Sequence, residues 1–214
     1  MAAAHAVGAT EAATLTQVHG NGVVVVRRGW DRPSGTSEAD VLVSDDPHVA
    51  LVVRAADCVP MLLGDRRTGA VAAIHAGWRG TAAGAAAAAL QNMHREFGTD
   101  PADIVAAIGP SIGACCYEVG SELVDAFAAA GHARHLIDRW FVTRPPARGS
   151  RERSTLRLDV AGANRDQLIL AGVPEECVYA AGLCTAEHLD VLTSFRAEKE
   201  LAGRLAGVIR ARTE

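Results

Sequence analysis

The stretch Ala55-Ala-Asp-Cys-Val-Pro-Met-Leu-Leu-Gly-Asp-Arg-Arg-Thr-Gly-Ala-Val-Ala-Ala-Ile-His-Ala-Gly-Trp-Arg-Gly80 contains two short apolar runs around one polar turn. The apolar runs are Val59–Gly64 and Ala70–Ile74, and the turn between them is Asp65–Gly69. Apolar runs of this length, bounded by turn residues, are typical of strands. We therefore predict an antiparallel hairpin. In such a hairpin, Cys58 before the first strand lies beside His75 at the end of the second.

The hairpin is followed by a long Ala-rich segment. Residues Thr81–Phe97 predict a helix that buries Leu90 and Met93, and Thr81 is a residue type preferred at helix N-caps. Free backbone amides at a helix start attract anions, and Arg79 adds a guanidinium next to them. One segment thus combines a thiol, an imidazole, a guanidinium and a candidate anion site.

Further strands and helices are predicted on both sides of the hairpin. The strands are Val23–Arg28, Ala39–Ser44, Val49–Arg54, Ile104–Ile108, Cys177–Ala181 and Arg204–Arg210. The helices are Ser121–Ala130 and Leu158–Ala171, the latter with Leu168 and Leu170 on its apolar face. We expect residues 1–14 to be loosely ordered and residues 131–153 to cross the surface. The pattern predicts a single α+β domain over residues 1–214, with layered mixed β-sheets flanked by helices.

Composition narrows the class of protein. The chain has 214 residues, of which 49% are hydrophobic, so it can bury a real core. A net charge of -4 and a pI near 6.1 argue against a nucleic-acid partner. No apolar run approaches the roughly 18–20 residues of a membrane span, and the start lacks the basic residues of a signal peptide. The five cysteines form an odd number, which favours a reducing, cytoplasmic location. The sequence does not indicate an oligomeric state.

Three residues beside turns or strand ends are candidate metal ligands: His19, Cys58 and His75. Two imidazoles and one thiolate suit a catalytic zinc site, which keeps a fourth position open for water or substrate. The spacing matches no compact ligand motif, so other interpretations stay open at this point. Cys58 could be a small buried residue, His19 a turn residue, and His75 a hydrogen-bonded histidine at a strand end.

The other thiols favour simpler interpretations. Cys115 and Cys116 invite a redox or metal role, but adjacent cysteines rarely bridge each other, so a packed loop is favoured. Cys184 is a loop thiol that could be a nucleophile, but no base lies near it in the sequence to support that role. The Gly109–Gly113 segment, which includes Ser111, could bind an anion through its amides, although a tight turn explains its glycines equally well. We expect the other six histidines to be solvated: His5, His48, His94, His132, His135 and His188.

Several motifs occur in a fixed order along the chain. They are Gln17-Val-His-Gly20, Ala56-Asp-Cys-Val-Pro60, His75-Ala-Gly-Trp-Arg-Gly80, Ile108–Gly113 with Cys116-Tyr-Glu-Val-Gly120, and Cys184-Thr185. From Thr16 to the C-terminus the sequence closely resembles the YfiH-like family. Members of that family are described as multicopper polyphenol oxidases (laccase-domain proteins), as purine nucleoside phosphorylases and as a peptidoglycan editing factor. The resemblance implies a mixed, layered α/β fold and a cytoplasmic protein.

The resemblance also implies a site. It places one zinc ion on His19, Cys58 and His75, with copper as an alternative metal. The implied activity is phosphorolysis of adenosine, inosine and related purine nucleosides, with adenosine deamination in some members. Two features depart from the family pattern. No Arg-x-Gly-Gly stretch precedes Gln17, and the family's Ser-Tyr-Arg-Arg element reads Ser194-Phe-Arg-Ala197, which removes one phenol and one guanidinium.

We therefore expect a zinc-dependent purine nucleoside phosphorylase that acts on small molecules, a purine nucleoside and phosphate. The expected catalytic residues are Asp57, Cys58, His75 and Arg79, and the expected substrate-binding residues are Arg79, Thr81 and Ser111. For Asp57, a role in supporting a ligand of the metal is an equal alternative. We expect Cys115 and Cys116 to be dispensable for this zinc.

Three other functions compete with this expectation. A polyphenol oxidase needs several coppers and histidines in close local motifs, whereas the eight histidines of this chain are scattered. A hydrolase that edits peptidoglycan precursors would use the same thiol and metal. A non-catalytic binding module is the third alternative.

Overall fold

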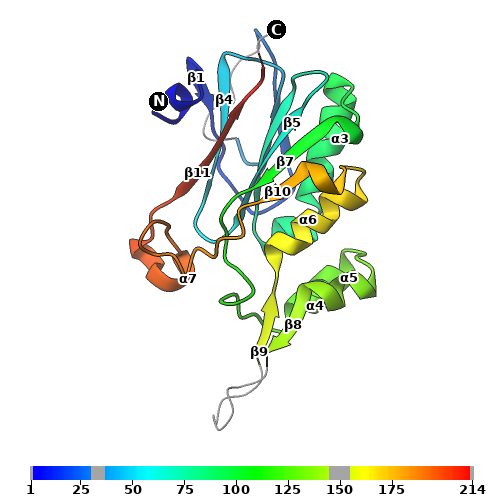
Figure 1. Ribbon diagram of the computed structural model, residues 1–214, viewed down its shortest axis with the longest axis vertical. Coiled ribbons are helices and arrows are strands. Elements are labelled where there is room, and N and C mark those ends of the chain that lie inside the picture. The colour runs from blue at the N-terminus through cyan, green and yellow to red at the C-terminus, as the bar shows by residue number, and fades with distance from the viewer. Residues whose placement is uncertain (1, 30–36, 145–154, 213–214) are drawn as a thin grey trace.

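The computed structural model describes residues 2–29, 37–144 and 155–212, and its centre is a six-stranded mixed sheet (Figure 1). The strand order is β10-β7-β5-β6-β3-β2. In chain order these strands are β2 (Val23–Val26), β3 (Val41–Ser44), β5 (Val59–Asp65), β6 (Val71–Ala76), β7 (Ile104–Ile108) and β10 (Val178–Ala180). The predicted hairpin is β5 and β6, which pair antiparallel with Pro60 opposite His75.

A second, three-stranded sheet packs on one face of this central sheet. Its order is β1-β4-β11, formed by β1 (Glu11–Ala13), β4 (Val49–Ala55) and β11 (Leu205–Arg210). The start of the chain differs from our expectation of a loosely ordered terminus. It forms α1 (Ala2–Ala6) and β1, which pairs parallel with β4. Ala4 and Ala13 are fully buried and share core clusters with residues of β4.

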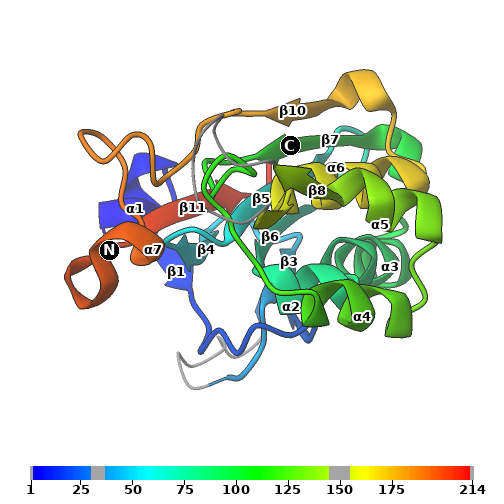
Figure 2. The same cartoon turned by 90° about the horizontal axis from the view of Figure 1, so that it is seen from below.

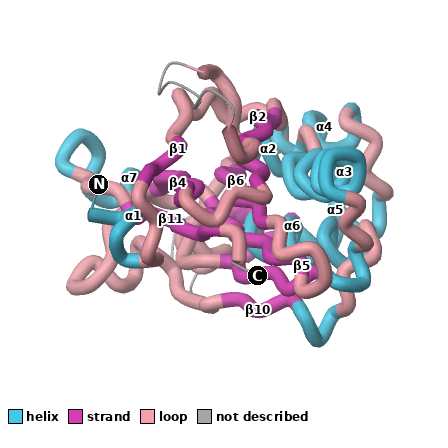
Figure 3. The backbone as a smooth tube through the Cα atoms, turned by 90° about the horizontal axis from the view of Figure 1, so that it is seen from above, coloured by secondary structure: helices cyan, strands magenta, loops and turns pink. Residues whose placement is uncertain are grey.

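Helices cover the other face of the central sheet. They are α2 (Trp78–Ala82), α3 (Ala85–Phe97), α4 (Glu122–Ala129), α5 (Arg134–Trp140) and α6 (Val160–Leu170). Figure 2 shows the resulting layers, with β1, β4 and β11 on one side of β5 and β6, and α3 and α6 on the other. In Figure 3, α1 and the short α7 (Phe195–Glu198) lie apart from these helices, on the side of the three-stranded sheet. In the described parts of the chain, no helix has the length and apolar character needed to cross a bilayer.

The two cores follow from the alternation of side chains along each strand. In β3, Val41 and Val43 face the helices, whereas Leu42 faces the three-stranded sheet. In β6, Ile74 faces the helices and Ala73 faces the other sheet. Because both faces are covered, the strands are apolar throughout rather than alternating with polar residues. The layered α+β class predicted from the sequence is confirmed.

The helix predicted at Thr81–Phe97 is in fact two helices. The first, α2, begins after Gly77 and includes Thr81, and the second, α3, begins after Gly84. Gly84 has a left-handed backbone (φ 75°), a conformation that glycine adopts without strain and that ends a helix. Thr81 is therefore inside a helix and is not an N-cap.

The segment expected to cross the surface contains structure as well. Residues Arg134–Trp140 form α5, and Phe141–Arg144 form β8, which pairs with β9 (Thr155–Leu158). Trp140 is buried and donates a hydrogen bond to Asp166 of α6 (2.9 Å). This large apolar residue therefore holds a basic segment of low periodicity against the core. The remainder of the stretch, 145–154, lies outside the described residues.

Two side-chain predictions also need correction. Leu170 is 66% exposed, because it lies at the end of α6, past the turn that contacts the core, whereas Leu168 is buried as predicted. His132 is half-buried rather than solvated. Its ring packs against Phe127 and Trp140, and its Nε2 lies 2.9 Å from the Ala82 carbonyl.

Candidate active site

The β5–β6 hairpin brings Cys58 and His75 to the same face of the central sheet. His75 follows Val71 and Ala73 at alternate positions of β6, so its side chain is on the side of the three-stranded sheet. Cys58 directly precedes β5, and the register that pairs Pro60 with His75 continues to place Cys58 opposite Gly77. The predicted proximity of the thiol and the imidazole thus follows from strand pairing.

His19 reaches the same place from the loop before β2. Its backbone is left-handed (φ 62°), an uncommon conformation for a residue with a side chain. Asp40, fully buried before β3, stabilises this turn by accepting hydrogen bonds from the backbone N–H groups of His19 (3.0 Å) and Gly20 (2.6 Å). The rings of His19 and His75 then meet edge to face, with centroids 4.9 Å apart.

Asp40 also orients His75. One carboxylate oxygen of Asp40 lies 2.8 Å from Nδ1 of His75, and both side chains are buried. This contact fixes the ring and leaves Nε2 available, the arrangement common in metal-ligating histidines. Burial raises the pKa of Asp40, but the hydrogen bonds from His75, Gly20 and His19 outweigh it and lower the pKa below its ordinary value. Asp40 is therefore an anion that supports two of the candidate ligands.

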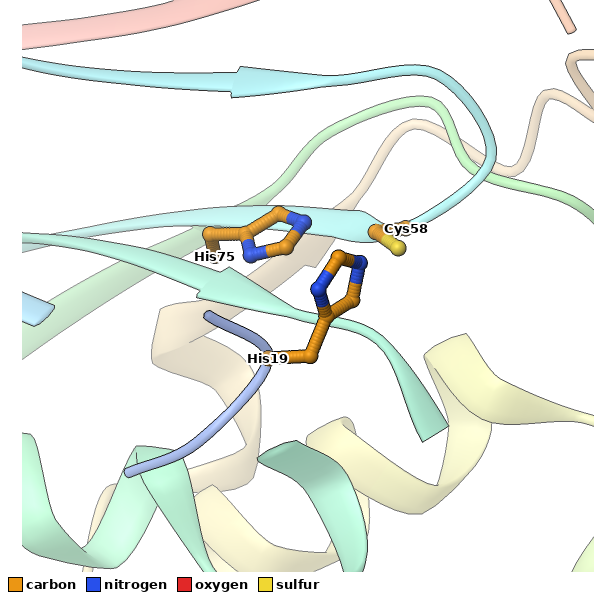
Figure 4. Close-up of side chains that lie close together, drawn as sticks. All are labelled: His19, Cys58 and His75. Atoms are coloured by element: carbon orange, nitrogen blue, oxygen red, sulfur yellow. The ribbon is translucent and has the colours of Figure 1, made fainter. Parts of the chain in front are cut away.

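The ligand atoms of His19, Cys58 and His75 all lie within 4.8 Å of one another, and Figure 4 shows the three side chains converging. Ligands of one tetrahedral zinc are about 3.5 Å apart, so small side-chain shifts would close the group around an ion. Burial, with the carboxylates of Asp57 and Asp40, raises the pKa of the Cys58 thiol to about 11. Burial and the nearby His75 lower the pKa of His19, which favours the neutral, ligating imidazole. The three residues form a group that could hold a metal ion.

The group opens into a cavity of about 790 Å³. Besides His19, Cys58 and His75, its wall contains aromatic side chains and four cations. The aromatic residues are Trp78, Tyr117 and Phe195, and the cations are Arg54, Arg196, Lys199 and Arg204. Among the described residues, none of these four cations forms an ion pair with a carboxylate. A cavity with aromatic faces and more cations than carboxylates in its lining suits a flat, partly anionic ligand.

The residues predicted to bind substrate are outside the lining of the cavity. Arg79 is exposed and its guanidinium stacks on the Trp78 ring at 4.5 Å, and its positive charge is near enough to act on the pKa of His19 and of Tyr117. Thr81 is fully buried: its hydroxyl donates to the Gly77 carbonyl (2.9 Å) and accepts from Asn164 (2.8 Å). Ser111 is also buried, with its backbone bonded to the Leu183–Thr185 segment. The structure does not bring Thr81 or Ser111 to the cavity.

Asp57 does line the cavity, but its carboxylate is already occupied. One oxygen accepts from the Thr185 hydroxyl (2.6 Å), and the other accepts from the Arg196 backbone N–H (2.6 Å). Its backbone is left-handed, with φ 85°. Asp57 thus connects the segment before β5 with two late segments of the chain.

Sequence reasoning did not single out Asp40 or the cavity cations. Asp40 had a signal, because it is an acidic residue within the predicted strand Ala39–Ser44, directly before Val41-Leu42-Val43. Arg54 and Arg204 carried no local signal, because they come from strand ends that meet only in the fold. All three aromatic residues of the cavity, Trp78, Tyr117 and Phe195, occur in the motifs quoted above, but the motifs did not indicate that these side chains line one cavity.

Fold and site together define a class: a layered α+β protein with a His–Cys–His group at the base of a cationic, aromatic-walled cavity. A family model described as multi-copper polyphenol oxidoreductase laccase matches residues 1–212. The chain therefore belongs to this family, the laccase-like YfiH family that its motifs resemble.

Individual relatives are similar over most of the chain. A purine nucleoside phosphorylase of Bacteroides thetaiotaomicron is 40% identical over 171 residues, 79% of this chain and 60% of that protein. An adenosine deaminase, RL5, from an unknown prokaryotic organism is 37% identical over 172 residues, 80% of this chain and 62% of that protein. The chain thus spans about three fifths of the length of these two relatives. The crystal structure of a hypothetical protein YfiH of Bacillus licheniformis matches with a TM-score of 0.85 and 31% identity, covering 98% of this chain and 78% of that one.

Proposed function

We propose that the protein is a zinc-dependent purine nucleoside phosphorylase, which converts adenosine or inosine and phosphate into the free base and ribose 1-phosphate. The observation that carries this proposal is the combination, in one cavity, of the His19–Cys58–His75 group with cations and aromatic side chains. Phosphorolysis needs a site for an anion and a site for a flat heterocycle, side by side. The name of the Bacteroides thetaiotaomicron relative supports the same reaction.

Phosphate would bind on the cationic wall. Arg204 is near enough to Cys58 to oppose the effect of burial on its pKa, so its positive charge reaches the metal group. Arg54, Arg196 and Lys199 add further positive charge. One guanidinium group can donate two parallel hydrogen bonds to two phosphate oxygens, so it orients the attacking phosphate as well as attracting it.

The purine would bind between aromatic side chains. Tyr117 and Phe195 line the cavity, and the Arg196 guanidinium stacks on the Tyr117 ring at 5.2 Å, which stiffens that wall. Burial, with the nearby Cys58, raises the pKa of Tyr117 to about 12. Its hydroxyl is therefore protonated at neutral pH and can donate a hydrogen bond to a nitrogen of the base.

In the reaction, a phosphate oxygen forms a bond to C1′ of the ribose while the bond from C1′ to the purine nitrogen breaks. The electron pair leaves with the base, which then takes up a proton. His19, Cys58 and His75 would hold the zinc, with Asp40 orienting His75. When bound, zinc supplies a positive charge that polarises an oxygen atom beside it. Arg204 and its neighbours neutralise phosphate so that it can approach the sugar.

Adenosine deamination is the second candidate activity, because the RL5 relative is named an adenosine deaminase. It would use the same cavity, with water in place of phosphate as the nucleophile. The products differ: deamination releases ammonia and needs no phosphate, whereas phosphorolysis releases free base and needs it.

The test is an assay of the zinc-loaded protein with adenosine and with inosine, each with and without phosphate. We expect free base and ribose 1-phosphate in equal amounts when phosphate is present, measured by chromatography. Ammonia from adenosine, without phosphate, would indicate deamination. Absence of phosphate-dependent base release from both nucleosides, with zinc fully bound, would reject the phosphorylase and favour a hydrolase of peptidoglycan precursors.

Single arginine variants test where phosphate binds. Arg204→Ala should raise the phosphate KM by about 10- to 150-fold, because a hydrogen bond to a charged group contributes roughly 1.5–3 kcal/mol. It should change the nucleoside KM much less. Arg79→Ala, at the exposed residue outside the lining, should have a smaller effect on the phosphate KM. Arg28→Ala, at an exposed position beyond β2, is the matched control. Equal effects of Arg204→Ala and Arg28→Ala would exclude the cationic wall as the phosphate site.

A further inference from the structure

A second group of metal-ligand side chains lies apart from the His19–Cys58–His75 group. The sulfur atoms of Cys115, Cys116 and Cys184 all lie within 4.8 Å of one another, and none of the three forms a disulfide. The sequence favoured a packed loop for the adjacent pair and left Cys184 unassigned. The fold unites them, although Cys184 is far from the pair along the chain.

Two backbone segments build this thiol cluster. A tight turn after Gly113, with the Cys116 N–H bonded to the Gly113 carbonyl (2.9 Å), presents Cys115 and Cys116. The loop after β10 presents Cys184, and it is joined to the first segment by backbone hydrogen bonds on both sides of Cys184. These are Ser111 N–H to the Leu183 carbonyl (3.3 Å) and Thr185 N–H to the Ser111 carbonyl (3.0 Å). The thiols are thus brought together by a paired backbone rather than by chance side-chain rotation.

Backbone N–H groups surround the Cys184 sulfur. It accepts a hydrogen bond from the Gly113 N–H (3.3 Å), and the N–H groups of Ala186 and Glu187, the latter bonded to the Cys184 carbonyl (3.2 Å), are near enough to lower its pKa. Several N–H donors on one sulfur favour the thiolate, the form that binds metals. Burial raises the pKa of Cys184, but these hydrogen bonds, together with one from Cys115, lower it below its ordinary value.

We propose that Cys115, Cys116 and Cys184 form a second metal site that binds Zn²⁺. Three thiolates are soft ligands that select zinc over the hard cations. Sulfurs on one tetrahedral zinc are about 3.8 Å apart, so the observed upper limit of 4.8 Å requires little movement. The group offers three sulfur ligands, so a water molecule would complete the tetrahedron. Cys115 and Cys116 are partly exposed, so an ion can reach them.

Zinc at this cluster would fix one wall of the cavity. Thr185, next to Cys184, donates its hydroxyl hydrogen bond to Asp57, the neighbour of Cys58. Tyr117, next to Cys116, lines the cavity. An ion that joins Cys116 to Cys184 would therefore clamp the segments that carry Tyr117 and Thr185. Its role is structural and its ligands are separate from those of the first group.

The experiment measures zinc in the intact chain by elemental analysis, after exposure to excess Zn²⁺ in reducing buffer and removal of loosely bound metal. We expect about two zinc ions per chain, falling to about one in Cys184→Ser and in His75→Ala, and to near zero in the double variant. Cys116→Ser is the second variant, in case Cys184→Ser does not fold, and should also retain about one ion. Cys177→Ser removes a thiol outside both groups and should retain both ions.

A second measurement separates the two groups without relying on stoichiometry. With Co²⁺ in place of zinc, the His75→Ala protein should keep strong sulfur-to-cobalt absorption, and adding Cys184→Ser should abolish most of it. Zinc content that is the same in Cys184→Ser, Cys116→Ser and Cys177→Ser would overturn the proposal. So would a thiol titration of the protein, purified without reductant, that finds two of the three cysteines joined in a disulfide and no second ion. Neither result depends on whether the protein is a phosphorylase.

Discussion

Gly77 lies directly beside two of the candidate metal ligands, Cys58 and His19. It lies opposite Cys58 in the continued register of β5 and β6. A Cβ atom at this position would be 2.9 Å from the Cys58 sulfur and 3.1 Å from Cδ2 of His19. Its backbone is extended and would accept any residue, so glycine is required here for space and not for conformation. Two of the three candidate ligands can converge because this residue has no side chain.

Gly77→Ala should therefore weaken zinc binding without unfolding the protein. The added methyl group displaces Cys58 and His19 from their common position. We expect a loss of affinity of about 10- to 100-fold, the scale seen when support of a metal ligand is removed. The measurement is zinc affinity by competition with a chelator.

Gly64→Ala is the matched control for this prediction. It changes another glycine of the same hairpin, where a Cβ would meet nothing within 4 Å. Equal zinc affinity in Gly77→Ala and the unmodified protein would show that the ligands do not converge as the structure has them.

At the scale of elements, the predictions that held were those that depend on local patterns. The β5–β6 hairpin was predicted from two apolar runs around Asp65–Gly69, and the side-by-side placement of Cys58 and His75 followed from pairing alone. The errors came from features that only tertiary contacts decide. Ala2–Ala6 and Glu11–Ala13 are too short and too uniform to show a period, and β4 supplies the pairing that orders β1. Trp140 becomes a core residue because its ring packs against Phe127 and His132 and Asp166 on α6 accepts its hydrogen bond.

The break between α2 and α3 at Gly84 changes the role that the sequence predicted for Thr81. Gly84 divides the predicted long helix, and Thr81 then falls inside α2, where it faces α6. Its hydroxyl accepts from Asn164, and its carbonyl accepts from Gln167 (2.9 Å). Thr81 therefore joins two helices and has no free hydrogen-bonding group for an anion.

Thr81→Val should destabilise the protein and leave phosphate binding unchanged. Valine has nearly the same shape, so the effect isolates the hydroxyl, whose loss leaves an N–H of Asn164 unpaired in the core. A buried, unsatisfied donor costs about 1–3 kcal/mol in the free energy of unfolding, measured by denaturant titration. Thr81→Ser keeps the hydroxyl and is the control. Unchanged stability together with a raised phosphate KM would restore the anion-binding role predicted from the sequence.

At the scale of the whole molecule, the cavity is built from segments that the sequence keeps far apart. The metal group could be predicted, because its residues occur in recognisable motifs and two of them share a hairpin. The cationic wall could not be predicted, because Arg54 lies near the end of β4 whereas Arg196, Lys199 and Arg204 come from the last part of the chain. These segments meet through pairing of β11 with β4 and through the hydrogen bonds to Asp57. Long-range contacts of this kind leave no local pattern.

Asp57 is the residue at which these distant segments are connected, and its role can be tested. The sequence allowed either a catalytic or a supporting role. In the structure both carboxylate oxygens are engaged, by the Thr185 hydroxyl and by the Arg196 backbone. We therefore expect Asp57 to position the wall that carries Phe195 and Arg196 rather than to transfer a proton.

Asp57→Asn is the informative change, since asparagine tolerates the left-handed backbone that Asp57 adopts. The amide has one oxygen in place of two, so it can keep the Arg196 N–H only by donating its own N–H to the Thr185 hydroxyl, and both connections then lose the carboxylate charge. A hydrogen bond to a charged group contributes roughly 1.5–3 kcal/mol against about 0.5–1.5 kcal/mol for a neutral one, so the wall loosens and KM for nucleoside and phosphate should rise about 10-fold, with kcat nearly unchanged. Thr185→Val, which removes one connection and leaves the carboxylate in place, should give the same pattern. A large fall in kcat in Asp57→Asn, absent from Thr185→Val, would instead identify Asp57 as a group that handles a proton in the reaction.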